Sequence, residues 1–381
     1  MPEIKIPLDW PNIGELEKKY LLEAIDSGFV SSSGPLIAEF EARFASFISA
    51  EHAVAVSSGT CGLHLALRLL GIGPGDEVIV PSLTFIATVN PVTYVGATPV
   101  VVDVTPDTWT LDPVKTKEAI TPRTKAIIPV HLYGNPADLN SISNLANNYG
   151  IYVIEDAAES LGATFSGKMT GTFGHIGVFS FNGNKVITTG SGGMIVTGDS
   201  KLAERARVLV NQGREKEQME YLHTEIGYNY RLTNLQAALG LAQLERLPQF
   251  LKAKKNISDI YHNMLDSLPG VIFQKELPEA RSSWWLTSVL IDPEEFGEKK
   301  TALMKRLISC GIQVRPFFVP MHRQPCFLEM YLQKNSIADE LYNRGINLPS
   351  ATFLTDESVR EVCDSIALVS KAINISGDAY G

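Results

Sequence analysis

The sequence predicts an α/β protein, in which a mainly parallel sheet carries helices on its faces and a smaller α+β domain follows. Two observations predict this fold. Apolar, β-branched segments of strand length alternate with helical segments from residue 50 to about residue 212, as in βαβ units. Near residue 270 this alternation ends. Because 381 residues correspond to about two domains, we expect a large domain at residues 1–249, whose N-terminal segment can reach the other domain, and a small domain at residues 250–381.

The elements follow from the local patterns. Two helices are expected within residues 15–50, around a break at 28–35 that is rich in glycine and serine. The large domain is expected to contain strands at 52–56, 77–80, 99–104, 125–130, 151–154, 174–181 and 193–196. Its further helices are expected at 62–70, 84–94, 140–148, 200–212 and 233–266. The small domain is expected to contain strands at 285–291 and 313–318, and helices at 298–309 and 356–373.

The composition argues against several classes of protein. The formal charge is −9 and no basic stripe is visible, so a dedicated nucleic-acid binder is not expected. The four cysteines lie far apart, and no pair has CxxC spacing, so we expect neither a disulfide scaffold nor a metal site. The apolar runs are strand-length, far short of the roughly 20 residues of a membrane span, and no signal peptide is apparent. We therefore expect a cytoplasmic enzyme with no membrane partner.

Two glycine-rich segments imitate phosphate-binding loops. Residues 71–75 (GIGPG) follow a helix and precede a strand, which is the reverse of the order that a phosphate loop needs. Residues 162–168 (GATFSGK) match GxxxxGK, but the next residue is Met169, where coordination of magnesium requires Ser or Thr. Both segments are therefore predicted to be turns.

A third segment is a better candidate for binding an anion. Residues 57–60 (SSGT) stand between a predicted strand and a predicted helix, so Gly59 and Thr60 offer backbone N–H groups at a positive helix N-terminus. Helix capping explains Ser or Thr there equally well, and that alternative stays open.

Two charged residues follow predicted strands. Asp156 comes two residues after the apolar run 151–154, which predicts a strand. It is therefore expected at the edge of an α/β sheet where ligands bind, and its carboxylate is suited to a positive ring nitrogen. Lys185 stands 29 residues later, in a segment otherwise free of charge, between an apolar strand and the glycine-rich turn 188–193. If it is desolvated, its amine can act as a nucleophile. The ordinary alternatives are a capping aspartate and a solvated loop lysine.

Together these features suit one cofactor, pyridoxal phosphate (PLP). PLP requires a lysine for its Schiff base, an acid beside its pyridine nitrogen and a cup for its phosphate. An aromatic side chain commonly supports the ring, and Phe85, in the segment that follows the strand at 77–80, is the candidate.

At this point the chain resembles the PLP-dependent nucleotide-sugar aminotransferases of fold type I, the DegT/StrS group. The resemblance covers nearly the whole chain. It is carried by 28–34 (GFVSSSG), 57–60 (SSGT), 75–88 (GDEVIVPSLTFIAT), 96–104 (GATPVVVDV), 121–134 (TPRTKAIIPVHLYG), 153–160 (VIEDAAES), 179–185 (FSFNGNK), 188–194 (TTGSGGM), 227–234 (GYNYRLTN), 315–322 (RPFFVPMH) and 345–349 (GINLP). It implies the fold type I architecture, a large PLP-binding domain with a smaller C-terminal domain.

The resemblance also implies roles for the cofactor residues. Lys185 would form the Schiff base and move protons, Asp156 would pair with the pyridine nitrogen, and Glu159 would lie near the ring hydroxyl, where many relatives carry Gln or His. Phe85 would stack on the ring. The phosphate would be held by Gly59, Thr60 and Ser180.

Further residues would act beyond the cofactor of the same subunit. Asn229 would reach the phosphate from the partner subunit, which implies a homodimer with shared active sites. Arg315 and His322 would face the substrate. The implied reaction moves an amino group from an amino acid, most often glutamate, to the keto group of a nucleotide-linked 4-keto-6-deoxyhexose.

The motifs that indicate which nucleotide sugar is the substrate point to two candidates. The segments 182–185, 190–193 and 281–286 resemble enzymes that aminate UDP-2-acetamido-4-keto-6-deoxyglucose at C4, and this substrate is the one we expect. The alternative is GDP-4-keto-6-deoxymannose, the substrate of GDP-perosamine synthases, which residues 121–134 and 321–322 resemble. Those enzymes usually carry an aromatic residue where Asn182 stands and Glu where Ser191 stands.

Two other classes stay open. A protein of this fold can lack turnover and act as a sensor or scaffold, although Lys185 and Asp156 are both intact. A PLP enzyme of another type, such as a decarboxylase or a cysteine desulfurase, is a further alternative. A desulfurase requires a mobile cysteine, whereas Cys61, which borders the predicted phosphate cup, is interpreted as a packing residue.

Overall fold

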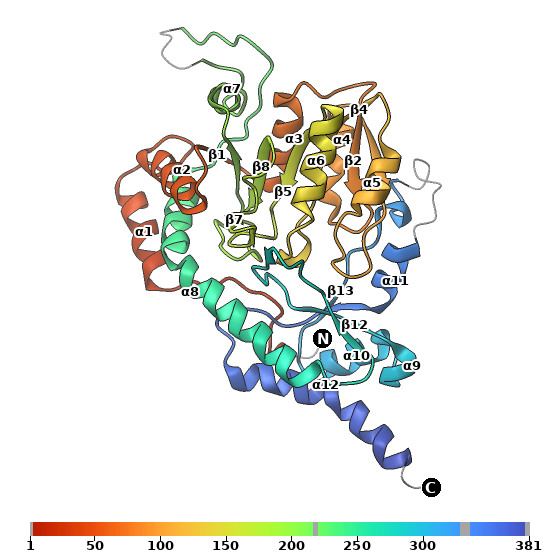
Figure 1. Ribbon diagram of the computed structural model, residues 1–381. Coiled ribbons are helices and arrows are strands. Elements are labelled where there is room, and N and C mark those ends of the chain that lie inside the picture. The colour runs from red at the N-terminus through yellow and green to blue at the C-terminus, as the bar shows by residue number, and fades with distance from the viewer. Residues whose placement is uncertain (1–2, 216–219, 328–335, 378–381) are drawn as a thin grey trace.

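The central feature of the computed structural model, which describes residues 3–215, 220–327 and 336–377, is a seven-stranded sheet (Figure 1). The strand order is β1-β9-β8-β5-β4-β2-β3. The strands are β1 (His52–Val56), β2 (Glu77–Pro81), β3 (Thr98–Val102), β4 (Thr124–Ile127), β5 (Tyr152–Asp156), β8 (Ile176–Ser180) and β9 (Gly193–Thr197). Every pairing from β8 to β3 is parallel, and β9 runs antiparallel to both of its neighbours. The predicted α/β class and mainly parallel sheet are confirmed.

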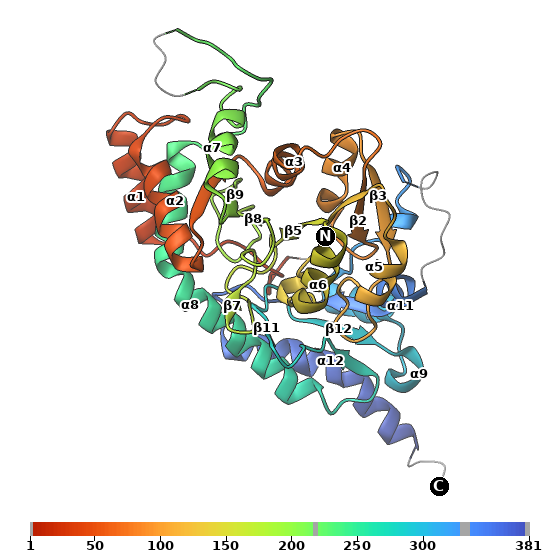
Figure 2. The ribbon, with the colours of Figure 1, turned by 45° about the horizontal axis from the view of Figure 1, so that its top comes forward.

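Helices cover both faces of this sheet, as Figures 1 and 2 show. One face packs on α3 (Gly59–Leu69), α4 (Asn90–Tyr94) and α7 (Ser200–Leu209), whose apolar residues share one core with the strands. The other face packs on two groups of helices. These are α5 (Pro113–Ala119) with α6 (Leu139–Tyr149), and α2 (Pro35–Ile48) with α8 (Asn234–Leu265). Helix α1 (Glu15–Asp26) lies outside, against α8.

The C-terminal part forms a second, smaller sheet with its own core. Its strand order is β10-β12-β14-β13, all antiparallel. Its strands are β10 (Val271–Phe273), β12 (Ser288–Ile291), β13 (Arg315–Pro316) and β14 (Gly345–Asn347). Its helices are α9 (Pro293–Phe296), α10 (Lys300–Ser309), α11 (Ser336–Arg344) and α12 (Asp356–Gly377). A three-stranded sheet of β11 (Ala280–Arg281), β6 (Thr164–Phe165) and β7 (Lys168–Met169) joins this part to the large sheet.

The expected domain boundary at residue 250 falls inside α8, which continues through it as one helix (Figure 1). The second half of α8 contributes Ile257, Tyr261 and Leu265 to the core of the small domain. The N-terminal segment also belongs to that core, since Ile6 packs in it and pairs with Ile312. One helix and one N-terminal strand-like segment therefore tie the two parts together.

Some expected elements are shorter in the structure. The helix expected at 84–94 is divided into the 3-10 helix η1 (Ile86–Thr88) and α4, because Pro91 favours the start of a new helix. The strand expected at 285–291 begins only at Ser288, because its pairing with β14 begins there, opposite Asn347. Both glycine-rich imitations are turns, as predicted: Gly71 and Gly167 have φ near 75° and follow a helix and a strand.

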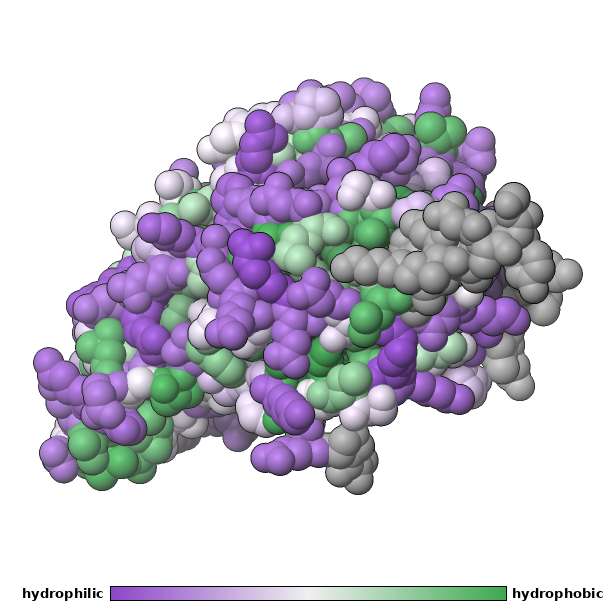
Figure 3. All heavy atoms as spheres, turned by 90° about the horizontal axis from the view of Figure 1, so that it is seen from below, coloured by the Kyte–Doolittle hydropathy of each residue, from purple (hydrophilic) through white to green (hydrophobic). Residues whose placement is uncertain are grey.

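The face that includes the small domain is mainly polar (Figure 3). Hydrophilic residues cover most of the face in Figure 3, with apolar residues in groups between them. Within residues 3–215, 220–327 and 336–377, none of the helices has both the length and the apolar composition needed to cross a bilayer.

A buried lysine joins the pieces at the domain junction. Lys254 on α8 is 1% exposed and donates three hydrogen bonds: to Asp9 Oδ1 at 2.9 Å, to the Trp285 carbonyl at 2.8 Å and to the Ser350 carbonyl at 2.7 Å. Its ammonium group thus connects the N-terminal segment, α8 and two loops of the small domain. Burial raises the pKa of Asp9 to about 6 in spite of Lys254, which shows that removal from water outweighs the attraction between the two charges.

We expect Lys254→Met to lower the free energy of unfolding by about 3 kcal/mol, because it leaves the Asp9 carboxylate and two carbonyl groups buried without a donor. Chemical denaturation would measure the loss. The matched control is Lys255→Met, since Lys255 is exposed. It pairs with Asp259 on the same helix and lies 5.4 Å from the centroid of the Trp284 ring, contacts that together are worth about 1 kcal/mol. Equal losses in the two variants would contradict the role assigned to Lys254.

Candidate active site

A cavity of about 640 Å³ lies at the carboxyl ends of β5 and β8. This is the edge of an α/β sheet at which ligands bind. The cavity brings together eight of the ten predicted site residues: Gly59, Thr60, Phe85, Asp156, Glu159, Ser180, Lys185 and Arg315. Residues of the small domain, among them Trp285 and Asn347, complete its wall, so the site exists only where the two parts meet.

The N-terminus of α3 forms one end of the cavity. Ser58 caps this helix by accepting a hydrogen bond from Cys61 N at 3.1 Å, so the proposed capping role is real. The first helical N–H groups, at Gly59 and Thr60, have no partner within the helix and suit an anion. Ser180 approaches so closely that a Cβ atom at position 59 would lie 2.9 Å from its Cβ. Glycine at position 59 therefore allows the helix end to meet β8.

Asp156 occupies the floor of the cavity at the end of β5. It is 5% exposed and accepts hydrogen bonds from Thr88 Oγ1 at 2.7 Å and from Ala158 N at 3.2 Å. These two donors fix the orientation of its carboxylate. Burial raises the pKa of Asp156, against the stabilising hydrogen bond of Thr88. A positively charged group bound next to this carboxylate would offset the cost of its burial.

Lys185 and Glu159 face each other across the cavity. Lys185 Nζ lies 3.7 Å from Glu159 Oε1, and the other oxygen of Glu159 accepts a hydrogen bond from Tyr133 N at 2.8 Å. The side chain of Lys185 is only 13% exposed. Burial raises the pKa of Glu159 to about 7, and the positive charge of Lys185 is the strongest opposing effect. Glu159 can therefore hold a proton near neutral pH.

Trp285 provides the surface on which Lys185 rests. Lys185 Nζ lies 3.9 Å from the centroid of the indole ring, within the range of a cation–π contact. The ring is held in turn, because Trp285 Nε1 donates to the Asn184 carbonyl at 2.6 Å and the Trp285 carbonyl accepts from Lys254. The buried lysine of the domain junction thus fixes the position of the lysine in the cavity through one tryptophan.

The rim of the cavity carries aromatic and basic side chains. Phe85 is about half exposed, and its ring centroid lies 5.4 Å from that of Phe318. Arg315 on β13 lines the same rim and is exposed. Asn182 and Ser191, which differ from the usual residues of perosamine synthases, also line the cavity. Asn182 and Ser191, the two positions that distinguish the candidate substrates, therefore line the active-site cavity.

Two predicted residues lie outside this cavity. His322 is buried, and its Nε2 atom lies 3.1 Å from Asp339 Oδ2. It does not line the cavity, because the 3-10 helix η3 (Met321–Arg323) directs it toward α11. Asn229 is exposed and stands in the segment that pairs with Asn211. In Figures 1 and 2 the chain between α7 and α8 extends away from the sheet, and Asn229 belongs to this connection.

Sequence reasoning missed two residues of the site. Thr88 lies in the segment 84–94, which the sequence predicts to be one helix, although it belongs to the same motif as Phe85. Trp285 was noted only as part of the segment 281–286, which was compared with enzymes of known substrate. No local pattern shows that Trp285 lies next to Lys185 in the folded chain. Its position depends on pairing across about 100 residues, which no periodicity reveals.

Comparison with known proteins agrees with this arrangement of residues. Residues 11–367 match the DegT/DnrJ/EryC1/StrS aminotransferase family. The chain belongs to this family. A GDP-perosamine synthase of Escherichia coli O157:H7 is 45% identical over 361 residues, which cover 95% of this chain and 97% of the relative. A GDP-perosamine synthase of Caulobacter vibrioides is 44% identical over 363 residues, with the same coverage of each chain.

Solved structures of family members have the same fold. DesV of S. venezuelae superposes with a TM-score of 0.87 at 37% identity, over 93% of this chain and 94% of DesV. The PLP form of Spr1654, a putative sugar aminotransferase of Streptococcus pneumoniae, superposes with a TM-score of 0.90 at 28% identity, over 97% of this chain and 99% of Spr1654. The predicted fold type I architecture is confirmed, and the protein is a PLP-dependent aminotransferase.

The residues in the cavity fit PLP. Lys185 offers an amine, Asp156 offers a buried carboxylate, and the N-terminus of α3 offers N–H donors for a phosphate. These three groups line one cavity. When bound, PLP supplies a ring that accepts electrons from the carbon atom that carries the amino group.

We expect Asp156→Asn to reduce amino transfer by at least about a hundredfold, because a neutral amide cannot stabilise a positive ring nitrogen as a carboxylate does. Thr88→Val removes one donor to this carboxylate and is expected to reduce the rate about tenfold. Single-turnover kinetics with glutamate would measure both. A Thr88→Val variant that is as impaired as Asp156→Asn would contradict this graded order.

The raised pKa of Glu159 gives a second expectation. In the cofactor-free protein, Glu159 keeps its proton up to about pH 7, whereas in the unfolded chain it loses the proton near pH 4.5. The folded state therefore binds more protons in between, and stability falls as the pH rises through this window, by roughly 2–3 kcal/mol. Thermal unfolding of wild type and Glu159→Gln from pH 4.5 to pH 7 would measure it. Parallel profiles would show that Glu159 does not titrate in this range.

Proposed function

We propose that the protein transfers an amino group from an amino acid, with glutamate the expected donor, to C4 of GDP-4-keto-6-deoxymannose, which is the reaction of a GDP-perosamine synthase. The observation that carries this proposal is the identity of 45%, 44% and 42% to three relatives of that name, each covering 95% of this chain. These identities favour GDP-4-keto-6-deoxymannose, the alternative substrate from the sequence analysis, over the expected UDP-linked sugar.

The UDP sugar remains a second candidate on one observation. Asn182 and Ser191 line the cavity, and GDP-perosamine synthases usually carry an aromatic residue and Glu at these positions. Ser191 Oγ donates to the Ser57 carbonyl at 2.9 Å, so it stands next to the segment proposed to bind phosphate. A change at this position can therefore alter how a substrate is held above the cofactor.

The residues of the cavity suggest how the chain promotes the reaction. Lys185 is the proposed proton carrier, because its Nζ atom lies over the cavity and is restrained by both Trp285 and Glu159. Asp156 is proposed to hold the ring nitrogen in its protonated form. Gly59, Thr60 and Ser180 are proposed to bind the phosphate at the N-terminus of α3. Phe85 is proposed to cover the ring, and Arg315 to meet the charged nucleotide at the rim.

We also propose a homodimer in which Asn229 serves the partner's site. Asn229 is exposed and does not line the cavity of its own chain. The apolar residues Leu22, Ile25, Phe29 and Val30 are each about half exposed, as expected of a surface that another chain covers. His322 is not proposed to contact substrate directly, and its buried contact with Asp339 suits a role in holding η3 against α11.

The substrate is tested by single turnover. The PLP-loaded protein is treated with glutamate, the glutamate is removed, and each keto sugar is then added separately while the absorbance of the cofactor is followed. Return of the starting spectrum with GDP-4-keto-6-deoxymannose alone is the expected result. Return with UDP-2-acetamido-4-keto-6-deoxyglucose alone would overturn the proposed substrate. The Lys185→Ala control cannot form the Schiff base, so the starting spectrum should not return in this variant if the signal comes from this site.

Shared sites are tested by complementation. Lys185→Ala and Asn229→Ala are each expected to be inactive as homodimers. Co-expression would form mixed dimers in which one site has both residues intact, so about a quarter of the wild-type activity should return. If Asn229 served its own chain, every site of the mixed dimer would lack one residue, and no activity would return.

A further inference from the structure

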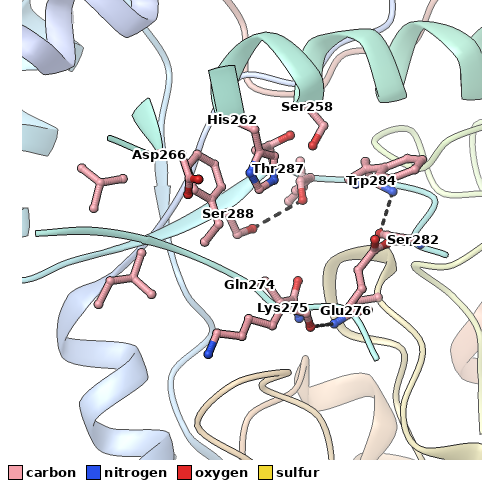
Figure 4. Close-up of a pocket in the computed structure, with 15 residues that line it drawn as sticks. Ser258, His262, Asp266, Gln274, Lys275, Glu276, Ser282, Trp284, Thr287 and Ser288 are labelled. Carbon is pink, nitrogen blue, oxygen red and sulfur yellow. Dashed lines mark hydrogen bonds between the residues drawn. The ribbon is translucent and has the colours of Figure 1, made fainter. Parts of the chain in front are cut away.

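A second cavity, of about 600 Å³, lies on the other side of the segment that carries Trp285. We call it the junction cavity; Figure 4 shows its wall. It is enclosed by α8, by residues 271–276 and by residues 282–288, and Asn135 of the large domain contributes to it. Trp284 lines the junction cavity and Trp285 lines the active site, while Leu286 borders both. The two cavities are therefore separated by the thickness of one chain segment.

The wall is rich in groups that both donate and accept hydrogen bonds. Ser258 and His262 stand four residues apart on one face of α8, and Asp266, the C-cap residue of this helix, follows four residues later. In Figure 4, Ser258 and His262 lie with Thr287 on one side of the cavity, and Gln274, Lys275 and Glu276 lie on the opposite side. Further hydroxyl groups come from Ser282 and Ser288.

The charges of the wall do not favour an anion. Burial lowers the pKa of His262, so its ring is neutral at pH 7. Lys275 Nζ is already paired with Asp107 Oδ1 at 2.8 Å. Asp266 and Glu276 contribute carboxylates. A phosphate or a nucleotide would meet these two negative charges and no unpaired cation in the lining, so a neutral or amino-substituted ligand is favoured.

Two buried oxygen atoms in this wall have no hydrogen-bond partner among the described residues. They are Asn135 Oδ1 and Thr287 Oγ1, in side chains that are 1% and 4% exposed. Buried polar atoms are nearly always paired, so each requires an explanation. A polar ligand bound in the cavity is one candidate partner for such an atom.

The wall also presents an aromatic surface whose backbone is held in an unfavourable conformation. Trp284 has φ of 48°, which is rare for a bulky residue. Its N–H group donates to Ser282 Oγ at 2.9 Å, which holds this conformation. The result is that an indole ring borders the junction cavity, opposite the polar groups of residues 274–276 (Figure 4). Strained residues of this kind gather at ligand sites.

We propose that the junction cavity binds a monosaccharide ring, uncharged or amino-substituted, with one apolar face on Trp284 and its hydroxyl groups on the serine, threonine and amide side chains. The volume is within the range of sites for small molecules. A sugar suits this wall because its ring carries many hydroxyl groups, each able to donate and accept, and no charge. The site is independent of the substrate proposed above, since it lies outside the active-site cavity.

The test is saturation-transfer NMR on the PLP-loaded, full-length protein. The probes are D-mannose, D-glucosamine and N-acetyl-D-glucosamine, with GDP-mannose as the nucleotide-linked source of a sugar ring. Thr287→Val keeps the shape and removes a hydroxyl that has no partner, so it is expected to fold normally. Trp284→Ala removes the aromatic wall. Arg315→Ala alters the active-site rim and is the matched control.

The expected result is binding of at least one free monosaccharide by wild type and by Arg315→Ala. Thr287→Val should weaken it about fivefold, and Trp284→Ala should abolish it. If only GDP-mannose binds, the site prefers a ligand whose phosphates the two carboxylates of the wall should repel, and the proposal is overturned. Failure of all four probes to bind wild type would overturn it. So would signals that survive both junction variants, or that disappear only in Arg315→Ala.

Discussion

The arrangement of this protein depends on one buried ammonium group. Lys254 donates to a carboxylate of the N-terminal segment and to two carbonyl groups of the small domain, and almost no water reaches it. A buried lysine is costly unless all its donors are used. The N-terminal segment and the loops around residues 285 and 350 must therefore close around α8 together. This requirement links the positions of the two domains, since α8 runs through both.

The geometry of the active site depends on this junction. Trp285 accepts a hydrogen bond from Lys254 through its carbonyl and presents its ring to Lys185. The large domain supplies the buried carboxylate, the helix N-terminus and the lysine, all at the ends of parallel strands. The small domain supplies the wall that restrains that lysine. The proposed role of Lys185 as a proton carrier requires a fixed resting position, because a misplaced proton carrier loses most of its effect.

The same junction leaves a second cavity. The segment 284–286 turns consecutive side chains to opposite sides, so that Trp284 faces one cavity and Trp285 the other. A ligand that orders Trp284 would act on the backbone that holds Trp285. Any coupling between the two cavities would therefore pass through a single peptide segment, whose φ at Trp284 is already constrained.

The fold class, most of the helices and strands, and the candidate cofactor residues were predictable from the sequence. Alternating apolar segments revealed the parallel sheet, and Asp156, Lys185 and residues 57–60 were visible because each follows a strand that ends at the same edge. Other features depend on which distant segments pack together and so appear only in the folded chain. Thr88 and Trp285 line the active-site cavity, whereas His322 contacts Asp339 outside it. The junction cavity likewise forms only where these segments meet. Local sequence patterns indicate which face of a helix or strand is buried. The contacts of Lys254 with Asp9 and Trp285 depend instead on the packing of the whole chain.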